Sequence, residues 1–175
     1  YTVMSLETLE GEVFGAFTSA PWHIDHGVFG TGESFLWRMK SSRAKTSDSV
    51  VEQARMESEI EVFKYSFENK AIQLCQNNRI AVGGGGSSTP RQIGGCTIMP
   101  NQWGFGIAFE GDIMMQGTSS PCITFNSPSL SKIHCDGTKF ELLNLEVWGL
   151  TPCLSIKEAE LMECRQLFLE RGTLI

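Results

Sequence analysis

Apolar and polar residues alternate in short runs along most of the chain before residue 150. In residues 34–40, "SFLWRMK", the apolar side chains of Phe35, Trp37 and Met39 occupy every second position. Alternation with this period predicts a β-strand that is covered on at least one face. In residues 3–17, "VMSLETLEGEVFGAF", two apolar-rich runs flank Glu10-Gly11, which predicts a hairpin with its turn at that dipeptide.

Further strands are predicted wherever short apolar runs end at turn residues. Between residues 41 and 59 the composition shifts to Ser, Lys, Glu and Gln, which indicates an exposed connection with a helical turn or two. Many short strands at close spacing favour a sandwich over a βαβ protein. The predicted strands are "EVFKYSF" (61–67), "AIQLCQ" (71–76), "RIAV" (79–82), a "GFGIAFEGDIMMQG" hairpin (104–117), "CITFNSPSL" (122–130, ending in a proline turn) and a central "KFELLNLEVWGL" (139–150).

A helix is predicted after the last strand. Ser155 and Glu158 have the S-x-x-E spacing of a capping box, and Gly172 is well placed to end the helix. Its apolar stripe is suited to docking on the same domain or on a partner, and both alternatives remain open. The stripe consists of Leu154, Leu161, Cys164 and Phe168.

Composition adds limits on function. The 175 residues carry 20 acidic and 14 basic side chains, a formal net charge of -6, so the chain has no electrostatic footprint for nucleic acid or an anionic membrane. No apolar run reaches transmembrane length, and the first ten residues do not resemble a signal peptide. The six cysteines form no C-x-x-C pair, which favours buried thiols in a reducing compartment.

The run "RIAVGGGGSSTP" (79–90) raises the question of a phosphate-binding loop. A P-loop requires a lysine and Ser/Thr leading into a helix, and here Ser87, Ser88, Thr89 and Pro90 follow the glycines. Consecutive glycines also do not match the spaced glycines of a dinucleotide-binding turn. A turn or a close approach of two backbones is therefore the favoured interpretation, with anion binding by bare amides as the alternative.

Two glutamates are candidates for acid–base chemistry. Glu33 and Glu146 each adjoin aromatic residues in segments predicted to be partly buried, and burial raises the pKa of a carboxylic acid. The structural alternative is a carboxylate that accepts backbone N–H groups and ties two loops together. "PWHIDHG" (21–27) is interpreted as an exposed loop, because a metal site there would need a third ligand from elsewhere.

Six motifs, taken in order, resemble the TLDc domain of oxidation resistance proteins and their relatives. They are "EVFGAFTSAPW", "GTGESFLW", "AVGGGG", "GFGIAFEGDI", "CITFNSPSLS" and "LEVWGL". The resemblance implies an α+β, mainly β fold in which two antiparallel sheets pack as a sandwich with short flanking helices and a C-terminal helix. It implies a TLDc domain over residues 1–150, without the family's usual opening segment, and a helical extension over 151–175. It also implies that the glycine run is architectural.

The resemblance further implies a protein-interaction module linked to oxidative-stress protection and to the vacuolar-type proton ATPase, with no established reaction, cofactor or metal. The implied location is cytoplasmic, and the periphery of an organelle membrane and a cytoskeletal assembly are the further options. Alternatives are an enzyme using Glu33 or Glu146, a thiol scavenger, and a structural component of a larger assembly. The family-signature positions are Gly15, Gly32, Glu33, Gly83, Gly84, Gly85, Gly86, Gly111, Asp112, Phe125, Glu146, Trp148 and Gly149.

Overall fold

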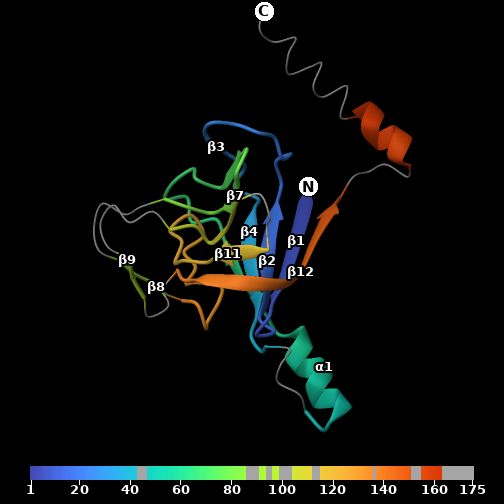
Figure 1. Ribbon diagram of the computed structural model, residues 1–175, viewed down its shortest axis with the longest axis vertical. Helices are drawn as coiled ribbons and strands as arrows, with labels where there is room; N and C mark the ends of the chain where they lie inside the picture. Colours follow the sequence, from blue (N-terminus) through green and yellow to red (C-terminus); the bar gives the residue numbers. More distant parts are fainter. Residues whose placement is uncertain are drawn as a thin grey trace, which may run out of the picture.

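The protein is mainly β-structure, with one large antiparallel sheet (Figure 1). The computed structural model describes residues 1–42, 47–85, 91–93, 96–98, 104–111, 115–135, 137–150 and 155–162. The strands are β1 (Thr2–Thr8), β2 (Val13–Thr18), β3 (Val28–Phe29), β4 (Phe35–Met39), β5 (Ile60–Lys64), β6 (Gln73–Gln76), β7 (Arg79–Val82), β8 (Arg91–Ile93), β9 (Cys96–Ile98), β10 (Ile107–Glu110), β11 (Gln116–Thr118) and β12 (Lys139–Gly149).

Ten strands form one continuous sheet in the order β3-β6-β7-β10-β11-β12-β1-β2-β4-β5, and β8 pairs with β9 separately. The long strand β12 joins the two halves of the large sheet. Its residues 139–141 pair with β11, and its residues 142–149 pair with β1. The register shifts where β1 meets this change of partner, between Glu7 and Thr8. A bulge of this kind increases the local bend of a sheet.

The prediction of two separate sheets is not confirmed, because hydrogen bonding continues through β12. The two halves of the one sheet nevertheless enclose a common core. Phe14 of β2 packs edge-on against Phe140 of β12, with ring centroids 5.4 Å apart. Leu36 of β4 lies so close to Gly106, just before β10, that a side chain at this glycine would collide with it. A single bent sheet therefore buries the apolar faces that the sequence pattern assigns to two.

The predicted hairpins are confirmed. β1 pairs with β2 through a turn in which Gly11 has a φ of 76°, and its N–H donates to the Thr8 carbonyl. The predicted 104–117 hairpin corresponds to the pair of β10 and β11, and β6 also pairs with β7. The strand predicted within "CITFNSPSL" is wrong: residues 123–126 form a turn closed by a bridge between Cys122 and Ser127. Asn126 occupies the left-handed region there, with a φ of 47°, which a strand does not accommodate.

Two short helices extend from the sheet. The first, α1 (Val50–Ser58), lies in the predicted polar connection; Ser49 caps it, and the structure buries none of its residues. The second is described over residues 156–162, where the Ser155 side chain accepts the N–H of Glu158 as the predicted cap requires. Within the described residues, no helix has the length and apolar character needed to cross a membrane.

Candidate functional site

The glycine run is part of the core packing. The Gly83 N–H donates to the Ile72 carbonyl (2.7 Å), and the Gly84 N–H donates to the Thr124 hydroxyl (3.0 Å). Gly83 has a φ of 69°, and a Cβ there would lie 2.6 Å from the sulfur of Cys122. These two amides are already bonded within the protein, so they are not available to an anion. The turn interpretation therefore holds for 83–85, while Gly86 lies outside the described residues.

The two predicted acid–base candidates are both exposed. Glu33 occupies a turn before β4, and Glu146 lies on β12. Glu146 accepts hydrogen bonds from the Asn144 amide (3.1 Å) and from the indole N–H of Trp148 (3.2 Å). Glu33 lies before β4, which is three strands away from β12 in the sheet, and it takes part in neither of these hydrogen bonds. The expectation that both carboxylates are partly buried is therefore wrong.

Among the described residues, the carboxylate that is buried is that of Glu12, which the sequence reasoning missed. Its side chain accepts the Ser131 hydroxyl at 2.6 Å and the Lys132 backbone N–H at 2.7 Å. Glu12 itself is 8% exposed and Ser131 is fully buried. This carboxylate ties the β1–β2 turn to the loop that precedes β12. The structural role considered for Glu33 and Glu146 is thus filled by a different glutamate.

The Glu12 cluster also includes a histidine, but its geometry does not match a nucleophilic triad. In such a triad the histidine stands between the nucleophile and the carboxylate. Here Ser131 contacts the carboxylate directly, and its Oγ is 3.4 Å from His134 Nδ1. The His134 backbone N–H donates to the same oxygen at 2.9 Å. A buried hydroxyl that is already engaged in this way cannot reach a substrate.

The histidine loop and the buried Cys122 offer little chemistry, while Cys135 is exposed. His23 Nε2 lies 3.6 Å from the carboxylate of Asp25, and both side chains are about half exposed. Backbone N–H groups of Gly27 and His26 lower the pKa of Asp25. Among the described residues, no three His, Cys, Asp or Glu side chains converge as metal ligands. Burial raises the pKa of the Cys122 thiol, which makes it a poor nucleophile.

The outer surface of β12, β1, β2 and β4 carries several aromatic side chains on one face of the sheet, here called the aromatic face. Phe17 stacks on Tyr1 on one side (5.9 Å between centroids) and on Phe35 on the other (5.0 Å). Val3 of β1 lies directly opposite both Phe17 and Trp148 in the strand register. The aromatic face consists of Tyr1, Phe17, Phe35, Trp37 and Trp148.

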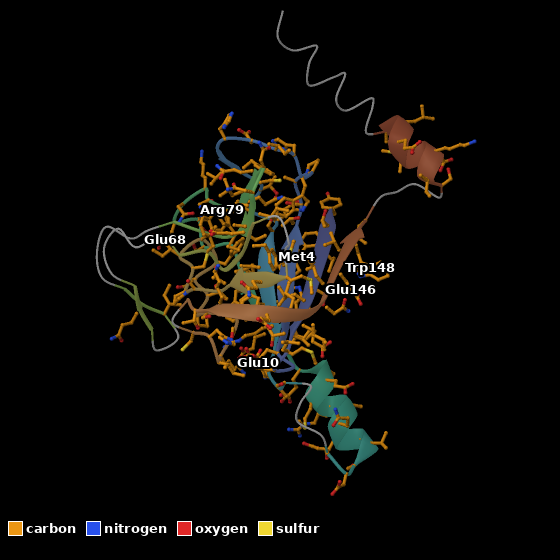
Figure 2. The ribbon with its side chains drawn as sticks, viewed as in Figure 1. Met4, Glu10, Glu68, Arg79, Glu146 and Trp148 are labelled. Carbon is orange, nitrogen blue, oxygen red and sulfur yellow. The ribbon has the colours of Figure 1, made fainter. Side chains whose placement is uncertain are left out.

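Two members of the aromatic face are held in place by signature residues. Figure 2 shows Trp148 and Glu146 together on β12, where the carboxylate accepts the indole N–H. Trp37 lies across Gly15, at which a Cβ would come within 2.9 Å of the indole ring. Trp148 is 61% exposed, and Tyr1 is exposed to the same extent. The face is therefore ordered by its own contacts, while Trp148 and Tyr1 remain open to solvent.

Several of the remaining signature positions serve the fold. A side chain at Gly32 would meet the ring of Tyr65, and Phe125 is buried in the core. Gly111 has a φ of 95° at the β10–β11 turn, while Gly149 has open space around it. Asp112, together with Leu154, Cys164 and Phe168 of the predicted helix stripe, lies outside the described residues. Leu161 is described and is 62% exposed.

Comparison with known sequences places these features in a family. The TLDc domain model matches residues 1–151. Oxidation resistance protein 1 of Yarrowia lipolytica is 26% identical over 147 residues, covering 83% of this chain and 48% of that protein. The human protein of the same name is 27% identical over 147 residues (84% and 12%). Nuclear receptor coactivator 7 of Mus musculus is 25% identical over 146 residues (83% and 12%). The chain thus spans less than half of the length of each of these relatives.

Proposed function

Because the chain belongs to the TLDc domain family, we propose that it is a non-catalytic protein-interaction module in oxidative-stress protection. The observation that carries this proposal is the aromatic face, which has the residue types that dominate binding energy at protein interfaces. The names of the matched oxidation resistance proteins support the link to oxidative stress. The partner that the family resemblance suggests for a first test is the vacuolar-type proton ATPase.

Trp148 is the expected anchor of the interface. Its indole is large and exposed, and the hydrogen bond to Glu146 limits the conformations that it must give up on binding. A partner that covers the indole would remove apolar area from water without reorganising β12. Glu146 places a negative charge beside Trp148, and the overall charge of -6 favours a partner surface with basic groups.

The test is affinity purification from native lysate with the domain as bait. Trp148→Ala should reduce capture of proton-ATPase subunits by about tenfold or more, since truncation of an anchor typically costs more than about 1.4 kcal/mol. Val51→Ala is the matched control, because it removes an apolar side chain that is 78% exposed on α1, away from the aromatic face. Capture that is equal for both variants would overturn the assignment of the interface.

A version that ends at Leu150 tests the alternative that the C-terminal helix carries the contact. If capture is lost with this version and kept with Trp148→Ala, the interface lies on the helix, and the proposal for the aromatic face fails. Recovery of a cytoskeletal or other assembly in place of the ATPase would keep the binding module and change its partner. The same experiment tests the proposed cytoplasmic location, because the domain must be in the same compartment as the partner that it captures.

A further inference from the structure

We propose that the free edge of β5 is a second binding site, which takes an extended acidic segment of a partner polypeptide as an added β-strand. β5 is the last strand at one end of the large sheet. Among the described residues it pairs only with β4. The other end of the sheet is β3, which has two residues against the five of β5. β5 is therefore the longer of the two edges.

The hydrogen-bond pattern shows which backbone groups of β5 face outward. The Lys40 N–H donates to the Glu59 carbonyl, one step before the β4–β5 ladder begins. In an antiparallel pair, hydrogen-bonded positions alternate with positions whose N–H and C=O point the other way. Glu61 and Phe63 therefore bond to β4, while Val62 and Lys64 direct their backbone groups to the open edge.

A groove lies along this edge. Its volume is about 740 Å³, and residues 62–66 line one side of it, while Gln92 and Ile93 of β8 line another. The buried side chains of Ile93 and Phe125 lie among its lining residues, together with polar Ser66, Gln92 and Asn126. Glu68, at its rim, is labelled in Figure 2. The open backbone groups of β5 and the groove beside them supply what strand addition uses: partners for main-chain hydrogen bonds, and space for a side chain.

Charge identifies the chemistry of the occupant. The two acidic residues at this strand are already paired, Glu61 with Arg38 at 2.6 Å and Glu59 with Lys40 at 3.8 Å. Lys64 is exposed, and no carboxylate of the described residues lies within ion-pair distance of it. It is the uncompensated charge of β5, and an acidic residue directly opposite would neutralise it.

A second copy of the chain meets this requirement poorly. In an antiparallel pairing of two β5 edges, outward positions face outward positions. Lys64 would then lie opposite Ile60, Val62 or another Lys64, and none of these carries a negative charge. The expected segment instead places Asp or Glu opposite Lys64, followed by an apolar residue opposite Phe63 that enters the groove.

The probe is a fluorescein-labelled peptide, Ser-Val-Glu-Val-Thr-Val-Ser, measured by fluorescence anisotropy against the whole chain. Its glutamate is placed opposite Lys64 and its second valine opposite Phe63. Methylation of the amide nitrogens of its glutamate and threonine should weaken binding at least about tenfold, because those N–H groups face β5. Binding that is unaffected by methylation, or absent up to about 1 mM peptide, would overturn the proposal.

Two variants test the edge from the protein side. Val62→Pro removes an N–H that β4 does not use and should weaken binding at least about tenfold. Lys64→Glu should weaken binding about two- to fivefold and should favour a peptide with lysine in place of glutamate. Equal peptide affinity of the wild type and both variants would refute the site. If Val62→Pro does not fold, the comparison of methylated with unmethylated peptide decides the question.

Two controls separate the β5 edge from the aromatic face and from self-association. Trp148 lies on β12, four strands along the sheet from β5, so Trp148→Ala should leave peptide affinity unchanged. Failure of the edge site is therefore distinguishable from failure of the aromatic face. Size-exclusion chromatography of the free protein tests the pairing of two copies. Self-association that Val62→Pro abolishes would assign the edge to another copy of the chain and overturn the proposal.

Discussion

Replacement of Glu12 by alanine is expected to destabilise the fold more than the loss of an exposed carboxylate. The change leaves two donors without their acceptor, the buried hydroxyl of Ser131 and the backbone N–H of Lys132, whose hydrogen bond is partly buried. A hydrogen bond to a charged group contributes roughly 1.5–3 kcal/mol, so two such bonds set an upper range of about 3–6 kcal/mol. Ser131 can turn toward His134 Nδ1, 3.4 Å away, and partly compensate. We therefore expect a loss of about 3 kcal/mol.

The assay is urea unfolding followed by tryptophan fluorescence, with the midpoint and the slope m compared between variants. Glu12→Gln keeps an acceptor for the Lys132 N–H and should lose about half as much stability as Glu12→Ala. Glu146→Ala is the matched control, because that carboxylate is exposed and should change the free energy of unfolding by less than about 0.5 kcal/mol. A Glu12→Ala protein as stable as this control would refute the assignment of Glu12 as a buried tie.

Three further predictions concern a glycine in the left-handed region, an ion pair and two cysteines. Gly83→Ala should cost at least about 2 kcal/mol in urea unfolding, because it combines a left-handed backbone with a collision at Cys122. The hydrogen bond from Arg38 lowers the pKa of Glu61 from 4.5. The stabilising effect of the pair is therefore present above pH 4.5 and is lost as the pH falls through the folded-state pKa. In Glu61→Gln the free energy of unfolding should depend less on pH below pH 4.5. In mass spectrometry after iodoacetamide treatment, exposed Cys135 should be modified in the native protein and buried Cys122 only after unfolding, and equal rates would contradict the burial.

Local pattern was sufficient for the hairpins and for the glycine run. The β1–β2 hairpin follows from two apolar runs around Glu10-Gly11, and its strands are neighbours in both sequence and space. For 83–85, the missing lysine and helix were enough to favour a turn over a phosphate site. A side chain at Gly83 would collide with Cys122, which lies far along the chain. The packing reason for this glycine could therefore not be predicted from the sequence.

Contacts between distant segments could not be predicted in this way. Glu12 is 119 residues from Ser131, and no periodicity links the two positions. β5 and β6 are consecutive in the chain, yet they lie in opposite halves of the sheet. The exposure of Glu146 also depends on tertiary structure, because it is set by which face of β12 turns outward. The position of Glu12 beside a hairpin turn is the one local feature of the sequence that points to its role.

Hydrogen–deuterium exchange of the domain with and without purified proton-ATPase subunits tests the central claim most directly. The account predicts slower exchange on binding in residues 1–3, 16–18 and 146–149, which carry or adjoin the aromatic face. It also predicts that Trp148→Ala removes this protection while the free protein keeps its native exchange rates. Protection confined to the segment after Leu150, or to the opposite face of the sheet, would contradict the claim that the aromatic face is the interface.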